Sequence, residues 1–108
     1  MKTKVLFVCL GNICRSPTAH GVFEKRVQDA GLAERIIVDS AATAAFHVGN
    51  PPDPRTVRAA AARGYDLTPQ RSRQVTKADF HQFDFILPMD RINLSNLRAI
   101  QPKDFAGH

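Results

Sequence analysis

The chain has 108 residues, 44% of them hydrophobic and 23% charged, so its length and composition fit one globular domain over residues 1–108. Fifteen Lys and Arg against ten Asp and Glu give a net charge of +5, but the cations are scattered and only one Tyr and no Trp accompany them, which argues against a nucleic-acid partner. The early apolar run at residues 5–10 is too short for a membrane span and has no signal-peptide cleavage site, so we expect a cytoplasmic protein with no membrane partner.

Three short apolar runs predict β-strands, at residues 5–8, 36–38 and 85–87. Continuous apolar runs rich in β-branched and aromatic residues are typical of parallel strands buried on both faces, and helical patterns lie between them. We therefore predict an α/β fold, a doubly wound parallel sheet with helices on both faces, of the flavodoxin or Rossmann-like type. In such sheets ligands bind beyond the carboxyl ends of the strands, which directs attention to the loop that starts at Cys9.

Helix starts are predicted at residues whose side-chain oxygens can cap an N-terminus, with Pro17 as the first residue of the first helix. The four expected caps are Ser16, Asp53, Thr76 and Asp90. The last of these helices is expected to bury the apolar residues Ile92, Leu94, Leu97 and Ile100.

The segment from Cys9 to Ser16 carries the residues with chemistry. A loop that follows a buried strand and runs into a helix can turn its amides inward, where they bind an anion together with the helix dipole. Gly11 and Asn12 are residue types that tolerate the left-handed backbone such a loop needs. Arg15 can offer two guanidinium N–H groups to a phosphate, and the amides would stabilise a Cys9 thiolate. The predicted phosphate-binding residues are Leu10, Gly11, Asn12, Ile13, Cys14 and Arg15.

A thiolate separated by five residues from an arginine is the layout expected for nucleophilic attack on phosphorus, with the charge held by amides and guanidinium. The alternative is a buried packing cysteine with a surface arginine nearby, but the strand before Cys9 and the helix start after Arg15 favour the phosphate site. Two cysteines so close together and four isolated histidines do not form a metal-binding pattern, so we expect no metal and no other cofactor.

Residues 8–17, VCLGNICRSP, resemble the active-site loop of the low-molecular-weight protein tyrosine phosphatases. Further segments match the family in order, at residues 39–41, 52–55, 64–67, 71–74 and 83–90. The resemblance implies the same doubly wound sheet and a metal-free hydrolysis of phosphotyrosine through a cysteinyl-phosphate intermediate. The implied partners are a phosphotyrosine-containing protein or an aryl phosphate as substrate and inorganic phosphate as product.

The resemblance also implies roles for single residues. Cys9 matches the nucleophile, Arg15 the group that clamps the phosphate in the transition state, and Ser16 the hydroxyl that hydrogen-bonds the thiolate and assists it as leaving group. Asn12 and Ser40 match a pair that supports the strained shape of the loop.

Two further positions have roles near the mouth of the loop in the family. Phe46 falls where the family often has an aromatic wall for the substrate ring, with a loop anchor as the equally weighted alternative. Cys14 matches a second cysteine that can form a disulfide with the oxidised nucleophile and so guard it against irreversible oxidation.

The family's general acid, an Asp in an Asp-Pro motif near its C-terminus, has no match in this sequence, because Asp53-Pro54 matches a different segment. The resemblance therefore predicts a chain that is C-terminally truncated relative to the family, without the acid loop and last helix, and a phosphatase that is impaired. An open sheet edge would then favour a homo-oligomer.

Two other functions stay open. A non-catalytic phosphate- or phosphopeptide-binding module would account for the absent acid. A thiol-dependent arsenate reductase shares the loop and the fold, but it needs further cysteines, and none follows Cys14. A branch of the family that acts on phosphoarginine has Thr at the position of Ile13, so Ile13 favours an aryl substrate.

Overall fold

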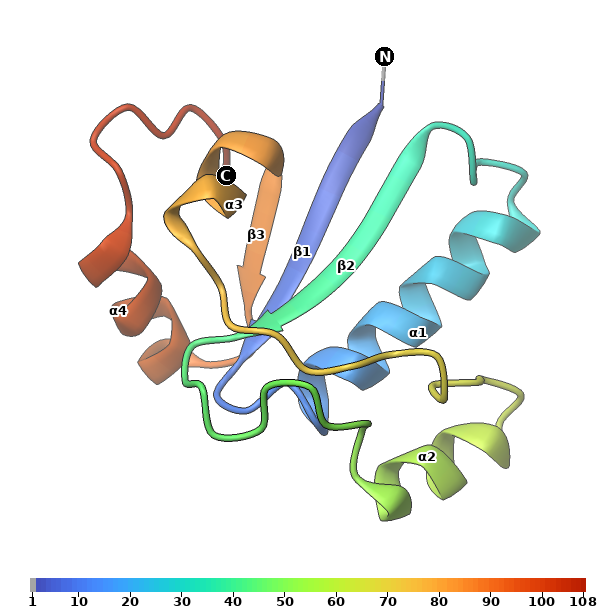
Figure 1. The fold of residues 1–108 in the computed structure, drawn as a ribbon. Helices are drawn as coiled ribbons and strands as arrows, with labels where there is room; N and C mark the ends of the chain where they lie inside the picture. The colour runs from blue at the N-terminus through green and yellow to red at the C-terminus, as the bar shows by residue number, and fades with distance from the viewer. Residues whose placement is uncertain (1) are drawn as a thin grey trace.

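Strands and helices alternate along the chain in the computed structural model, which describes residues 2–108 (Figure 1). The elements are β1 (Thr3–Cys9), α1 (Arg15–Asp29), β2 (Ile36–Ala42), α2 (Pro54–Ala61), α3 (Lys77–Gln82), β3 (Phe85–Pro88) and α4 (Arg91–Ile100). No helix in the described range combines the length and the apolar character needed to cross a bilayer.

The three strands form a parallel sheet in the order β2-β1-β3, which confirms the predicted fold class. Val5 of β1 lies opposite Val38 of β2 and Phe85 of β3. The carboxyl ends of the strands therefore meet at one edge, and the arrows in Figure 1 converge there. At this edge the central strand β1 ends in Cys9, which is paired with Ala42.

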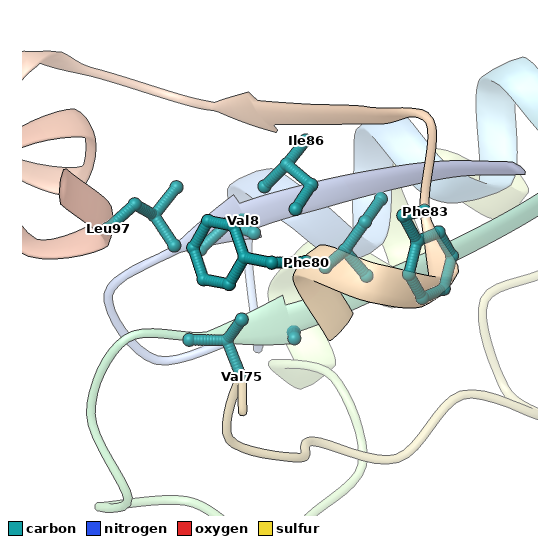
Figure 2. Packing of buried hydrophobic residues seen from close by; sticks show 8 residues of the cluster. Val8, Val75, Phe80, Phe83, Ile86 and Leu97 are labelled. Carbon is teal, nitrogen blue, oxygen red and sulfur yellow. The ribbon is translucent and has the colours of Figure 1, made fainter. Parts of the chain in front are cut away.

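Alternate residues of β1 supply the two layers of apolar packing, because successive strand side chains point to opposite faces. Leu6 and Val8 are fully buried on the face covered by α3 and α4. On the other face Phe7 packs edge-to-face on Phe23 of α1, with ring centroids 5.8 Å apart. The cluster on the first face, shown in Figure 2, contains Leu6, Val8, Ala41, Val75, Phe80, Phe83, Ile86 and Leu97.

Three of the four predicted helix caps are confirmed. Asp53 accepts from the Arg55 amide, Thr76 and its N3 residue form a capping box, and Asp90 accepts from the Asn93 amide. The prediction for α1 is wrong, because the helix begins at Arg15 and Ser16 lies inside its first turn. The Ser16 hydroxyl is held by two side chains of the preceding loop instead of by a helix amide.

The apolar face predicted for α4 is only partly correct. Leu97 is buried at 4% exposure, but Ile92 is 70% exposed and the neighbouring Asn93 is buried in its place. The Asp90 cap fixes the start of the helix on the Asn93 amide, and Asn93 and Leu97 are four residues apart, which puts them on one side of the helix. The first residue of α4 that faces the core is therefore Asn93, one position after the expected Ile92.

The outer edge of β3 is partly occupied by the last residue of the chain. The Ile86 amide donates to the His108 carbonyl and the His108 amide donates to the Asp84 carbonyl, both at 2.8 Å, which is the pattern of a parallel bridge. The His108 ring stacks on Phe85 with centroids 5.1 Å apart. Beside this bridge, the side chains of Phe85 and Leu87 remain more than one-third exposed.

Candidate active site

The backbone carbonyls of the loop after β1 are bound to the protein that surrounds the loop. Because the N–H and C=O of a trans peptide point in opposite directions, carbonyls held outward turn the following amides toward the inside of the loop. The bonds from outside the loop are Thr43 N to Cys9 O (2.9 Å), Ala44 N to Leu10 O (3.0 Å), Ser72 Oγ to Gly11 O (2.9 Å) and Asp53 N to Ile13 O (2.7 Å). The Cys14 carbonyl accepts from Thr18 N (3.2 Å) as the first hydrogen bond of α1. The amides of the loop therefore line its inner side at the start of α1, an arrangement that favours the binding of an anion.

The sulfur of Cys9 lies at the base of this loop. Cys9 is buried at 4% exposure, and its Sγ accepts from the Asn12 amide at 3.2 Å and lies 3.0 Å from the Ser16 Oγ. A thiolate at this position would accept from both groups, and neither is an acid that could neutralise it. The structure therefore brings together Cys9, Asn12 and Ser16.

Asn12 adopts the left-handed backbone that the loop requires, with φ of +56°. Its side chain donates to the Ser16 Oγ at 2.8 Å and accepts from the Arg73 amide at 3.2 Å. The residue is 2% exposed, so these two bonds satisfy an amide that would otherwise be buried without partners. Asn12 thus connects the loop to the helix behind it and to a distant segment of the chain.

Gly11 is required for a different reason from the one predicted. Gly11 does not adopt the left-handed backbone. Within residues 2–108 a positive φ is found at Asn12, Gly31, Gly49 and Gly64. A Cβ at Gly11 would lie 2.9 Å from Cδ2 of His47, closer than real Cβ contacts are found. The absence of a side chain therefore allows the 43–50 segment to approach the loop.

Residues 72–73 brace the loop from outside, a function that the sequence analysis missed. The Ser72 hydroxyl holds the Gly11 carbonyl at 2.9 Å, and the Arg73 amide holds the side chain of Asn12. The Arg73 guanidinium bonds Asp39 at 3.1 Å and Asp79 at 3.0 Å. Burial acts to lower the pKa of Arg73, but the hydrogen bond to Asp79 and the charges of both carboxylates outweigh it, so the pKa is raised. The only signal in the sequence was that residues 71–74 match the family.

Ser40 supports the loop indirectly. Its hydroxyl lies 2.9 Å from Nδ1 of His20 and 3.5 Å from Oε1 of Gln70, rather than against Asn12. The Gln70 side-chain amide donates to the Pro17 carbonyl at 3.0 Å. Within the described residues Asn12 and Ser40 therefore have different hydrogen-bond partners and do not bond each other. Asn12 supports the loop directly, and Ser40 lies beside the first turns of α1.

Arg15 makes a contact that the sequence analysis did not foresee. Its Nη1 donates to Oδ2 of Asp90 at 2.7 Å, with both side chains about half-exposed. This hydrogen bond is the main reason that the pKa of Arg15 is raised. The pKa of Asp90 is lowered, first by the Asn93 amide that it caps and then by Arg15. Asp90 was recognised from the sequence only as a helix cap.

The remaining predicted residues lie on the surface around the loop. Phe46 is 74% exposed and its ring contacts His47 edge-on, so it does not anchor its loop in the interior and remains available to a ligand. Leu10 is 46% exposed. Cys14 is an exposed free thiol that accepts from the Thr56 hydroxyl at 3.2 Å. Residues 2–108 contain no group of three or more His, Cys, Asp or Glu side chains placed to hold a metal ion.

A parallel sheet whose central strand ends in a buried cysteine, followed by an amide-lined loop, an arginine and a helix, defines a class of α/β proteins with a cysteine-based phosphate loop. The sequence model of the low molecular weight phosphotyrosine protein phosphatases matches residues 4–106. The chain therefore belongs to this family, which confirms the resemblance found in the sequence.

Individual relatives agree with the family model. The chain is 48% identical over 101 residues to the low molecular weight phosphotyrosine protein phosphatase of Schizosaccharomyces pombe, covering 93% of this chain and 64% of that protein. It is 52% identical over 93 residues to the human protein of the same name, covering 86% of this chain and 58% of that protein. A crystal structure of a protein tyrosine phosphatase from Entamoeba histolytica superposes with a TM-score of 0.92 at 42% identity, over 96% of this chain and 66% of that one. The chain thus spans between 58% and 66% of the length of these relatives.

Proposed function

We propose that this chain is a cysteine-dependent phosphatase domain that acts on phosphotyrosine or other aryl phosphate monoesters. The Cys9 thiolate attacks phosphorus, the S–P bond forms as the P–O bond to the aryl group breaks, and the phenolate leaves with a proton taken from an acid or from water. Water then attacks the cysteinyl phosphate, which releases inorganic phosphate and restores the thiolate. The observation that carries the proposal is the position of the Cys9 sulfur inside a loop in which the carbonyls of Cys9, Leu10, Gly11 and Ile13 are hydrogen-bonded by donors outside the loop.

The other residues of the loop have roles that follow from their contacts. Ser16, at 3.0 Å from the Cys9 sulfur, stabilises the thiolate before attack and again when it leaves from phosphorus. Arg15 supplies the positive charge for the equatorial phosphate oxygens, with one guanidinium nitrogen already held by Asp90. Asn12 keeps the loop in its left-handed turn. The exposed Phe46 and the half-buried Ile13 supply apolar surface for an aryl group.

We expect residues 1–108 to act slowly on phosphotyrosine. The Asp53 carboxylate caps α2 and pairs with Arg55 at 3.3 Å, and the Asp90 carboxylate pairs with Arg15. Because each carboxylate is paired with an arginine in its ionised form, neither is suited to act as the proton donor. Tyrosine is a poor leaving group, with a pKa of about 10, and a positioned acid contributes roughly 10²–10⁴-fold. A nitrophenolate leaves without such help, so p-nitrophenyl phosphate is the better substrate for this chain.

The decisive experiment compares p-nitrophenyl phosphate with a phosphotyrosine peptide in wild type and in a Cys9→Ser variant. The proposal requires turnover of p-nitrophenyl phosphate, a phosphorylated cysteine detected by mass spectrometry after rapid quenching, and loss of both in the variant, with phosphate binding retained. Turnover that survives Cys9→Ser would refute the cysteine mechanism. Equal rates on both substrates would contradict the expected weakness toward phosphotyrosine.

Two alternatives lead to different outcomes of the same assays. A phosphate- or phosphopeptide-binding module would bind inorganic phosphate without forming a phosphorylated cysteine. An arsenate reductase would consume thiol in the presence of arsenate, but both cysteines, Cys9 and Cys14, lie in one loop and the later part of the chain supplies no third.

We also propose that copies of this chain associate through the side chains of Phe85 and Leu87 on β3, which are more than one-third exposed although His108 occupies part of the backbone edge of the strand. Light scattering across a range of protein concentrations tests this, and a monomer at every concentration would contradict it. The two free thiols fit a reducing compartment, so we retain the cytoplasm as the proposed location.

A further inference from the structure

A groove of about 740 Å³ lies between α1 and α2, outside the loop that holds Cys9. Figure 1 shows α2 away from the sheet and near the first half of α1. The groove is lined by Cys14, Thr18, Val22, Asp53, Arg55, Thr56, Ala59, Ala60, Arg63 and Tyr65. None of these side chains has a role in the phosphatase chemistry proposed above, except that Cys14 belongs to the same loop.

The chemistry of the groove combines an apolar surface with positive charge. Val22, Ala59 and Ala60 supply the apolar surface. Asp53 is the one acidic side chain among the lining residues, and Arg55 neutralises it. The guanidinium of Arg63 has no ion pair or hydrogen bond within residues 2–108, so it is left as an uncompensated positive charge at the groove.

We propose that this groove is a second binding site, for a small amphipathic anion such as an aryl carboxylate. The carboxylate pairs with Arg63, and the aromatic ring lies against Val22 and Ala59. The volume falls within the roughly 300–1,000 Å³ of small-molecule sites, which are mostly apolar with a few polar groups that fix orientation. The positive charge of Arg63, unpaired within the described residues, favours an anionic ligand over a cationic one.

The groove is separate from the phosphate site but adjoins it. The Thr56 hydroxyl donates to the Cys14 sulfur at 3.2 Å, so the thiol of Cys14 faces the groove. Asp53, another lining residue, holds the Ile13 carbonyl through its amide at 2.7 Å. A ligand in the groove would therefore contact the outer side of the same loop whose inner side binds phosphate.

The test uses 1-naphthoate as the probe, titrated into isotope-labelled protein and followed by amide chemical shifts. Expected are shifts at Cys14, Thr56 and Ala59, which persist when inorganic phosphate saturates the Cys9 loop. The Cys14 thiol gives a second readout, since a bound ring would slow its alkylation by iodoacetamide in a Cys9→Ser background.

Two pairs of variants locate the site. Arg63→Glu should weaken naphthoate binding by roughly five-fold or more, whereas Arg58→Glu, an exposed residue of α2 outside the groove, should change it less than about two-fold. Ala59→Trp should fill the groove and abolish binding, while Ala61→Trp, exposed and outside it, should not.

Equal weakening by the two charge reversals would overturn the proposal in favour of a general electrostatic effect. Displacement of the probe by phosphate would show that it occupies the Cys9 loop instead. Absence of any shift at millimolar probe would overturn the site altogether. None of these outcomes depends on catalytic turnover, so the groove and the proposed phosphatase activity can fail independently.

Discussion

The guanidinium of Arg15 donates to the carboxylate of Asp90 at 2.7 Å, although the two residues are 75 positions apart in the sequence. Arg15 begins α1 and Asp90 caps α4, so this bond joins the starts of two helices that follow two neighbouring strands of the sheet. One carboxylate therefore both caps a helix and holds the cation that the proposed reaction needs.

We expect Asp90→Ala to slow formation of the cysteinyl phosphate from p-nitrophenyl phosphate by roughly ten- to a hundred-fold, because Arg15 loses the contact that positions it. Asp90→Asn keeps an oxygen for Arg15 and a side chain able to cap α4, so it should stay within about three-fold of wild type. Single-turnover kinetics measure both. A wild-type rate in Asp90→Ala would show that Arg15 is positioned by other contacts.

The same residue gives a pH dependence to stability. The pKa of Asp90 is lowered in the folded chain, first by the Asn93 amide and then by Arg15, so folding favours the ionised carboxylate. The contribution of Asp90 to the free energy of unfolding is fully present above the pKa of the unfolded state, about 3.9. It is lost as the pH falls through the lower pKa of the folded state. We expect wild type to exceed Asp90→Asn in free energy of unfolding at pH 6 and this difference to vanish at strongly acidic pH. Urea titrations at several pH values measure it, and a pH-independent difference would contradict the assignment.

Asn12 contributes through both its side chain and its backbone, and two variants separate these effects. Asn12→Gly keeps the left-handed turn but loses the bonds to Ser16 and to the Arg73 amide, which should cost about 2 kcal/mol of unfolding free energy. Asn12→Ala loses the same bonds and also places a Cβ at φ of +56°, which should cost about 1 kcal/mol more. Equal stability of the two variants in urea would show that the backbone at residue 12 is not under constraint.

Gly11→Ala should destabilise the chain by about 1 kcal/mol, because the new methyl group would meet Cδ2 of His47 at 2.9 Å. His47 is a half-buried side chain and can move, so the cost is moderate. In a His47→Ala background the same substitution should cost little, and a double-mutant cycle in urea measures the difference. A cost that is independent of residue 47 would assign the effect to the backbone of the loop.

The elements of the fold were largely predictable because they depend on local signals. Continuous apolar runs marked all three strands, and the side chains of Asp53, Thr76 and Asp90 marked three helix starts. The start of α1 was not predictable in this way, because Ser16 uses its hydroxyl on the Cys9 sulfur. The face of α4 was predicted only in part, because Leu97 is buried as expected but Asn93 is buried where Ile92 was expected.

The central residues of the candidate site could also be predicted from the sequence, because they lie within eight consecutive positions. They are Cys9, Asn12, Arg15 and Ser16. The residues that hold the loop in place from outside could not be predicted in this way. Ser72 and Arg73 reach the loop from 61 positions away, and no pattern in the sequence indicates such pairings. Arg73 is also half-buried between the carboxylates of Asp39 and Asp79, a position that the sequence does not indicate.

The outward bonds of the loop carbonyls have a consequence for how the molecule acquires its binding ability. The donors sit at residues 43, 44, 53 and 72, so the ring of amides closes only after the first two-thirds of the polypeptide has come together. Affinity for an anion should therefore appear late and cooperatively during refolding. A peptide with the sequence of the loop alone should not bind oxyanions, because binding depends on the assembled tertiary structure.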